Sequence, residues 1–208
     1  MKNSKPAVVI FAREPILGTV KSRLSPVLDD AERLSLYKRM LRHTSAVVGS
    51  EEEICGYLYS TPDKDHPYLK ALSKRFDLYQ QVQIKGVLGE KMTAAFEDVL
   101  EHTHKAILIG SDCPFITGDY IESAISRLSN TTVVIGPATD GGFVMIGTTD
   151  HKLTKPLFRD IEWGTSNVLD TLLKNAQTSD IDIELMEPLN DVDRPEDLEL
   201  LEGFTWFE

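Results

Sequence analysis

The sequence predicts an α/β fold of three layers, in which helices cover both faces of a mostly parallel, mixed β-sheet. Three observations support this fold class. Several short segments are apolar without alternation, which is typical of strands buried on both faces. Segments with a helical apolar stripe lie between them. An Asp-Gly pair also separates two apolar runs, which predicts a hairpin and therefore one antiparallel strand.

The strands are expected in chain order from these apolar runs. The clearest ones span residues 7–12, 105–110 and 132–136. Weaker strands are expected at 54–60, 78–84, 142–147 and 181–189. Residues 61–67 contain two prolines and two aspartates, and we interpret them as a connector rich in turns.

Four helices are expected where apolar residues recur at steps of three and four. Their stripes run through residues 34–48, 92–100, 121–128 and 168–173. The cations of the first helix, Arg33, Lys38, Arg39 and Arg42, are expected on its solvated face.

The 208 residues suit one domain that buries roughly 70% of its unfolded surface without a disulfide or a metal. Two cysteines without zinc-site spacing indicate a reducing, cytoplasmic environment. The apolar runs are far shorter than the ~20 residues that span a bilayer, so we expect no membrane span. Residues 1–6 do not resemble a signal peptide.

The charge is unevenly distributed. The net charge is −11, yet the first 50 residues hold nine Lys and Arg against four Asp and Glu. An acidic protein is a poor partner for nucleic acid, which requires many phosphate contacts. A locally basic segment can still bind one small phosphorylated ligand.

The basic segment follows the first predicted strand, where ligands of parallel sheets bind. Arg13, Lys21 and Arg23 lie in a loop interrupted by Pro15 and Gly18. Arginine and lysine side chains at such a place could hold a diphosphate. The loop matches neither the dinucleotide-binding nor the P-loop glycine pattern, and an ordinary surface loop remains the alternative.

Two acidic positions follow other strands. Asp112 is the second residue after the apolar run 107–110, where a carboxylate is well placed for Mg²⁺ or Mn²⁺. A turn-capping role is the alternative, although Thr117 is already a candidate cap for the next helix. Near the C-terminus, Asp193 and Glu196 have the spacing of a capping box, which does not prevent Asp193 from also binding a metal.

Three further segments are candidates. Residues 136–143 include Gly141 and Gly142 beside Asp140, which permits close approach of a ligand or simply forms a hairpin. Residues 85–92 place Gly89 at a helix N-terminus that could face an anion, or form a plain loop. Residues 162–165 could line an acceptor pocket, with Trp163 as a core residue in the alternative interpretation.

The order of these motifs resembles the nucleotide-diphospho-sugar transferase superfamily, which has the glycosyltransferase-A fold. The likeness extends over residues 6–203 and is greatest to a bacterial branch of arsenosugar-biosynthesis-like glycosyltransferases. It implies one Rossmann-like domain over residues 1–208 and a divalent metal ion, Mg²⁺ or Mn²⁺. The sequence departs from the expected pattern at Lys91, Gly164 and Arg194.

The resemblance also implies roles for individual residues. Asp112 and Asp193 would be the metal ligands, and Lys21 would act in catalysis. Asp140 and Glu162 are candidate bases for an acceptor. The expected cofactor- and phosphate-binding positions are Arg13, Gly18, Lys21, Arg23, Gly89, Gly141 and Gly142. For all of this to hold, the basic loop and the two metal-binding aspartates must meet in the fold.

The predicted function is transfer from a nucleotide substrate to a small-molecule acceptor. The first version is a metal-dependent glycosyltransferase that uses a nucleotide-sugar donor. The alternative is a nucleotidyltransferase that joins a nucleoside triphosphate to a phosphorylated small molecule. A non-catalytic nucleotide-binding module is a third possibility, and it predicts nucleotide binding that is indifferent to metal.

Overall fold

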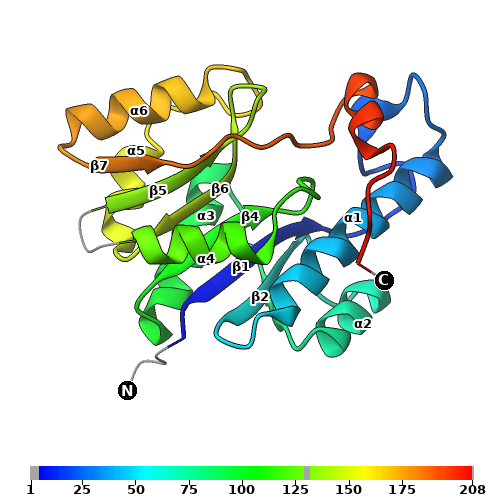
Figure 1. Cartoon of the computed structure of the whole chain (residues 1–208), viewed down its shortest axis with the longest axis horizontal. Coiled ribbons are helices and arrows are strands. Elements are labelled where there is room, and N and C mark those ends of the chain that lie inside the picture. The colour runs from blue at the N-terminus through cyan, green and yellow to red at the C-terminus, as the bar shows by residue number, and fades with distance from the viewer. Residues whose placement is uncertain (1–4, 129–131, 208) are drawn as a thin grey trace.

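Seven strands form one mixed sheet in the computed structural model, which describes residues 5–128 and 132–207 (Figure 1). The first four residues, on which part of the signal-peptide prediction rests, lie outside the described residues. The strands are β1 (Ala7–Arg13), β2 (Cys55–Thr61), β3 (Tyr79–Val82), β4 (Ala106–Gly110), β5 (Thr132–Pro137), β6 (Phe143–Thr148) and β7 (Asp182–Leu185). Their order across the sheet is β3-β2-β1-β4-β6-β5-β7.

All strand pairs are parallel except those of β6, which runs antiparallel to both β4 and β5. The predicted hairpin between β5 and β6 explains this exception. The mostly parallel, mixed sheet predicted from the sequence is therefore confirmed. Its parallel strands end at one edge, where the loops after β1, β2, β3 and β4 come together.

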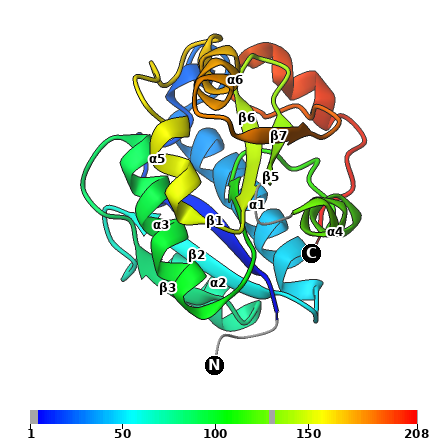
Figure 2. The same cartoon turned by 90° about the vertical axis from the view of Figure 1, so that its left-hand side faces the viewer.

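Helices cover both faces of the sheet. One face packs against α1 (Asp30–Ser50), α2 (Pro67–Arg75) and α4 (Gly118–Arg127), and the other against α3 (Leu88–His102), α5 (Thr154–Leu157) and α6 (Val168–Thr178). Short 3-10 helices are η1 (Ser22–Leu24), η2 (His151–Leu153) and η3 (Pro195–Leu201). Figure 2 shows α3 and α5 on the opposite side of β1 from α1. No helix in the described part of the chain is both long and apolar enough to cross a membrane.

The two apolar faces of β1 explain its continuous hydrophobic sequence. Val8 and Ile10 belong to the core under α1, α2 and α4, whereas Ala7 and Val9 belong to the core under α3, α5 and α6. All four side chains are fully buried. The strand is therefore a central one, as its lack of alternation predicted.

The helix α2 was not predicted, because its start lies at the end of the segment that we interpreted as a connector. Pro67 occupies the first turn, and the Nδ1 atom of His66 accepts a hydrogen bond from the Tyr68 N–H at 3.1 Å. A proline at this position and a side-chain cap favour a helix start. The preceding prolines and aspartates concealed that signal.

The C-terminal residues pack against α1. The Nδ1 atom of His43, on α1, accepts a hydrogen bond from the Phe207 N–H at 3.0 Å. The rings of Phe204 and Trp206 contact the His43 ring, with centroids 5.1 and 5.6 Å away. Burial lowers the pKa of His43, although a backbone hydrogen bond with Pro114 opposes the shift.

We expect acidification to detach this C-terminal segment, because protonated Nδ1 cannot accept the Phe207 hydrogen bond. A histidine with a lowered folded pKa contributes stability above its unfolded pKa, 6.5, and loses it as the pH falls toward the folded value. Trp206 fluorescence in a Trp163→Phe background should therefore change as the pH falls below the unfolded pKa of 6.5. A His43→Gln variant should remove that transition, and its persistence would contradict the assignment.

Candidate active site

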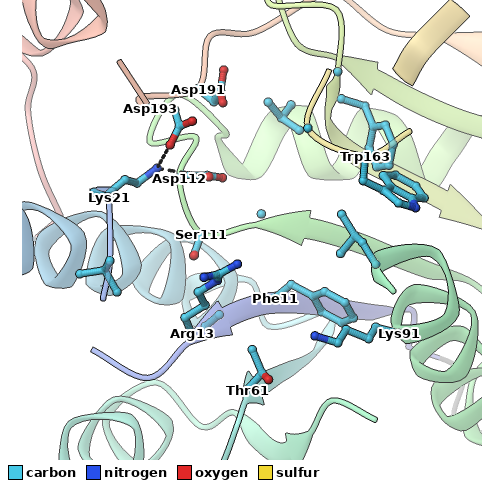
Figure 3. Close-up of a pocket in the computed structure, with 18 of the residues that line it drawn as sticks. Phe11, Arg13, Lys21, Thr61, Lys91, Ser111, Asp112, Trp163, Asp191 and Asp193 are labelled. Atoms are coloured by element: carbon cyan, nitrogen blue, oxygen red, sulfur yellow. Dashed lines mark hydrogen bonds and ion pairs between the residues drawn. The ribbon is translucent and has the colours of Figure 1, made fainter. Parts of the chain in front are cut away.

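A cavity of about 740 Å³ opens at the carboxyl ends of the parallel strands (Figure 3). Arg13 ends β1, Thr61 ends β2, and Ser111 and Asp112 follow β4 on its wall. The start of α3, the β5–β6 hairpin, residues 163–165 and the chain after β7 also contribute to the lining. The cavity therefore lies where ligands of parallel sheets bind.

Lys21 joins the basic loop to two acidic segments from distant parts of the chain. Its Nζ atom lies 3.3 Å from Oδ2 of Asp112 and 3.4 Å from Oδ1 of Asp193 (Figure 3). The Lys21 side chain is only 5% exposed. Arg23 contacts the other oxygen of Asp193, with Nη1 2.6 Å from Oδ2. The three segments thus meet at one wall of the cavity, and the chemical roles of these residues stay predictions.

The conformation of the basic loop depends on α1. Lys21 has left-handed backbone angles, φ 49° and ψ 44°, directly before η1. Arg33 donates a hydrogen bond from Nη1 to the Val20 carbonyl at 3.3 Å and also pairs with Asp30. The prediction that Arg33 lies on a solvated face is therefore wrong, because this side chain is buried and anchors the loop that carries Lys21.

Asp112 is free of the turn-capping role that we considered. Thr117 caps α4 instead, accepting a hydrogen bond from the Tyr120 N–H at 3.2 Å. Gly110 leaves room for the carboxylate, since a Cβ at that position would lie 2.6 Å from Oδ1 of Asp112. The Asp112 carbonyl accepts a hydrogen bond from the Val192 N–H at 2.9 Å. This bond ties the C-terminal segment to the end of β4.

The capping box predicted for Asp193 and Glu196 is wrong by one residue. The helix η3 begins after Arg194, and the Asp197 carboxylate accepts hydrogen bonds from the Asp193 and Arg194 N–H groups at 2.9 and 2.7 Å. Asp197 therefore does the capping. This arrangement leaves the Asp193 carboxylate available for Lys21 and Arg23.

The charges in the cavity shift two carboxyl pKa values in opposite directions. Burial raises the pKa of Asp191 to about 6, and the nearby charges of Asp112 and Asp140 add to the shift. Burial also acts on Asp193, but Lys21 and Arg23 outweigh it and lower its pKa. The carboxylate of Asp193 is therefore stabilised by two cations, whereas burial and neighbouring carboxylates disfavour the ionised form of Asp191.

Of the other predicted site residues, Asp140 and Gly142 line the cavity. Oδ1 of Asp140 accepts a hydrogen bond from the Gly142 N–H at 2.9 Å. Gly141 has a φ of +93°, and a Cβ there would lie 2.1 Å from the Ser166 carbonyl oxygen. The hairpin thus requires glycine at position 141 for its backbone, whatever the ligand.

Four predicted residues are not part of the cavity lining, namely Gly18, Gly89, Gly141 and Glu162. A Cβ at Gly89 would lie 3.0 Å from atoms of Phe158 and Trp163, so this glycine permits close helix packing. Trp163 itself packs edge-on against Phe143 and Phe158 and also lines the cavity. Lys91 lines the cavity from the first turns of α3.

Three residues that line the cavity were not predicted as site residues, namely Gln83, Ser111 and Asp191. A signal for Asp191 existed in the alternation of Asp-Val-Asp. In an extended segment, alternate side chains point the same way. Val192 is fully buried, and the two aspartates flanking it line the cavity.

Comparison with known proteins agrees with this architecture. Residues 34–165 match the model of a family described as "Uncharacterized protein conserved in bacteria (DUF2064)". A 2-phospho-L-lactate guanylyltransferase of Methanobrevibacter ruminantium is 25% identical over 171 residues, covering 74% of this chain and 67% of the relative. The enzyme of the same name from Methanopyrus kandleri is 23% identical over 184 residues, covering 87% and 84%.

Solved structures share the fold. A protein of Desulfovibrio desulfuricans G20 assigned as a nucleotide-diphospho-sugar transferase has a TM-score of 0.83 at 23% identity, covering 96% of this chain and 87% of that one. A nucleotidyl transferase of Methanothermobacter thermautotrophicus has a TM-score of 0.68 at 11% identity, covering 97% of both chains. The fold implied by the superfamily resemblance is confirmed, and the named relatives are all transferases.

Proposed function

The chain belongs to the bacterial family DUF2064, and from its site we propose that it is a nucleotidyltransferase that joins a nucleoside triphosphate to a phosphorylated small molecule. The observation that carries the proposal is the buried ammonium group of Lys21, which lies between Asp112 and Asp193 at the wall of the cavity. The curated relatives, which are guanylyltransferases, support the same reaction class.

In this reaction a phosphate oxygen of the acceptor attacks the α-phosphorus of the triphosphate. The bond from the α-phosphorus to the bridging oxygen breaks, and pyrophosphate leaves with the electron pair. Arg13, Lys21 and Arg23 line the cavity and supply positive charge for the departing pyrophosphate. Lys21 is the best-placed of the three to keep a fixed position, because its side chain is buried and paired on two sides.

The nature of the acceptor favours nucleotidyl transfer over glycosyl transfer. A phosphate acceptor is already ionised at neutral pH and needs no base to activate it. A sugar-accepting hydroxyl needs a base to remove its proton in the transition state. Of the two candidate bases, Asp140 lines the cavity and Glu162 does not. The cavity thus offers three cations, Arg13, Lys21 and Arg23, to phosphates, and only one of the two candidate bases to a hydroxyl.

We propose that a divalent cation, Mg²⁺ or Mn²⁺, binds at Asp112 and Asp193, with Asp191 beside them. Among residues 5–128 and 132–207, no preformed group of three His, Cys, Asp or Glu side chains has a geometry that could hold a metal ion. The donors nevertheless suit the ion, because all are carboxylates, and the charges of Asp112 and Asp140 add to the burial that raises the pKa of Asp191. Such an ion would neutralise phosphate charge during transfer.

The proposal is tested by incubating the protein and Mg²⁺ with each nucleoside triphosphate and a phosphorylated acceptor. GTP with 2-phospho-L-lactate is the first pair to examine, because the curated relatives carry that name. Release of pyrophosphate that requires both substrates would support nucleotidyl transfer. Release of a nucleoside diphosphate from a nucleotide sugar, without pyrophosphate, would support glycosyl transfer instead.

A further inference from the structure

Gln83 lines the cavity, and its side chain has an acceptor oxygen without a hydrogen-bond partner among the described residues. It lies far along the chain from Asp112, Asp191 and Asp193. It follows β3, and its side chain is buried, with the residue only 9% exposed. Its backbone N–H donates to the Ser60 carbonyl at 2.9 Å, which fixes the residue against β2. The residue nevertheless lines the cavity.

The orientation of the Gln83 amide is determined by its partners. Nε2 donates to the Tyr59 carbonyl at 2.9 Å and to the Ala12 carbonyl at 3.2 Å. A primary amide has two N–H donors, and both are used here. Because both partners are carbonyl oxygens, the reversed orientation would place three acceptors together. The side-chain atom that contacts both carbonyls is therefore the donor, Nε2.

This leaves Oε1 as the free hydrogen-bonding group of the side chain. No residue in the described part of the chain donates a hydrogen bond to it, and both bonds of the side chain are made by Nε2. Among the described residues Oε1 is not one of the fully buried side-chain atoms that lack a partner, so it is open to solvent at the cavity that Gln83 lines, where a ligand or water can donate to it. The acceptor is also rigid, because the carbonyls that hold the amide belong to β1 and β2.

We propose that Oε1 of Gln83 accepts a hydrogen bond from the Watson–Crick edge of a guanine base, and that Gln83 is a specificity-determining residue. This inference rests on the proposed function. Guanine carries two adjacent donors on that edge, N1–H and the 2-amino group. Leu88, at the start of α3, lines the same cavity with a side chain that is part exposed and apolar, and offers a surface for the plane of the base.

The proposal places the two ends of the nucleotide on different walls. Arg13, Lys21 and Arg23 lie on the basic loop and the end of β1, and they serve the phosphates. Gln83 follows β3 and Leu88 begins α3, and we infer that both contact the base. A base that lacks the matching donor binds a rigid acceptor more weakly, because the acceptor then loses its water without gaining a hydrogen bond.

The test measures by calorimetry, in the presence of Mg²⁺, the Kd values of GTP and two base analogues. The same measurements are made on the native protein and on Gln83→Met. The analogues are inosine triphosphate, which lacks the 2-amino group, and 1-methylguanosine triphosphate, which lacks N1–H. We expect at least one of them to bind the native protein about tenfold more weakly than GTP. In Gln83→Met that difference should shrink to within about twofold, because the acceptor is gone.

Two controls separate base recognition from a structural role. 7-Deaza-GTP changes the opposite edge of the base and should bind each protein about as GTP does. Gln81→Met, two residues earlier on β3, should keep the native preference. Should Gln83→Met fail to fold, Gln83→Lys can still donate to the Tyr59 and Ala12 carbonyls while removing the acceptor, and it should lose the same preference.

Two results would overturn the proposal, and they are distinguishable. If GTP binds but neither analogue is discriminated, or the discrimination persists in both Gln83 variants, then Gln83 does not read the base while the proposed function stands. If no nucleoside triphosphate binds at all, the proposed function fails and the inference fails with it.

Discussion

Lys21→Met is expected to reduce kcat/KM for nucleotidyl transfer by at least ~100-fold, because it removes a positioned positive charge from the site of the departing pyrophosphate. The ammonium group has little freedom in the native protein, since it lies 3.3 and 3.4 Å from two carboxylates and is nearly buried. Its loss also leaves Asp112 and Asp193 close together without the shared cation. The measurement is pyrophosphate release under steady-state conditions with the pair of substrates that the native protein uses.

The backbone at Lys21 calls for a second variant. Its φ of +49° is a left-handed conformation that glycine adopts without strain, so Lys21→Gly removes the side chain while keeping the loop. Both variants should be impaired to a similar extent. Lys155→Met is the matched control, because Lys155 is exposed and pairs with Glu97 outside the cavity. Near-native activity of Lys21→Gly would contradict the role of this lysine.

Much of the fold was predictable because it depends on local patterns. The continuous apolar character of β1 and β4 marked them as central strands, and Asp140-Gly141 marked the hairpin that makes β6 antiparallel. The short helix α2 escaped prediction because only nine residues form it, next to a segment with strong turn signals. Patterns identify elements well where many residues repeat the same signal.

The site was predictable where a charged residue lies within a few residues of the end of a strand. Asp112 follows β4, and the fold alone brings such a residue to the carboxyl edge of the sheet. Gln83 carried no comparable signal, since its significance depends on carbonyls of β1 and β2 that lie far away in sequence. Sequence spacing cannot reveal a partner that is supplied by tertiary structure.

The two errors at charged residues have a shared physical cause. Arg33 was expected in solvent because arginine on a helix is usually exposed, yet the basic loop folds over it and uses it as an anchor. Asp193 was expected to cap η3 because of its spacing to Glu196, yet Asp197 accepts both N–H groups. In each case the side chain instead makes a contact that is distant in sequence, Arg33 with Val20 and Asp193 with Lys21 and Arg23.

Asp112→Asn is expected to abolish the metal-dependent part of nucleotide binding and to reduce kcat by ~100-fold or more, because an amide is a far weaker ligand for Mg²⁺ than a carboxylate. The substitution preserves shape, so the Val192–Asp112 backbone bond and the end of β4 should persist. It also removes one of the charges that raise the pKa of Asp191, which should therefore fall from about 6. Thermal shifts of the native and variant proteins with a nucleotide, with and without Mn²⁺, measure the effect, since a ligand that binds only the native state raises the melting temperature.

Asp119→Asn provides the matched control, because Asp119 is exposed in the first turn of α4, only seven residues along the chain and outside the cavity. This variant should retain the full Mn²⁺-dependent shift. A non-catalytic nucleotide-binding module predicts the opposite pattern, in which nucleotide raises the melting temperature equally with and without Mn²⁺ and Asp112 can be replaced without effect. If Asp112 and Asp193 hold the ion together, Asp193→Asn should also abolish the Mn²⁺-dependent shift of the melting temperature. A full Mn²⁺-dependent shift in Asp193→Asn would contradict a shared metal site.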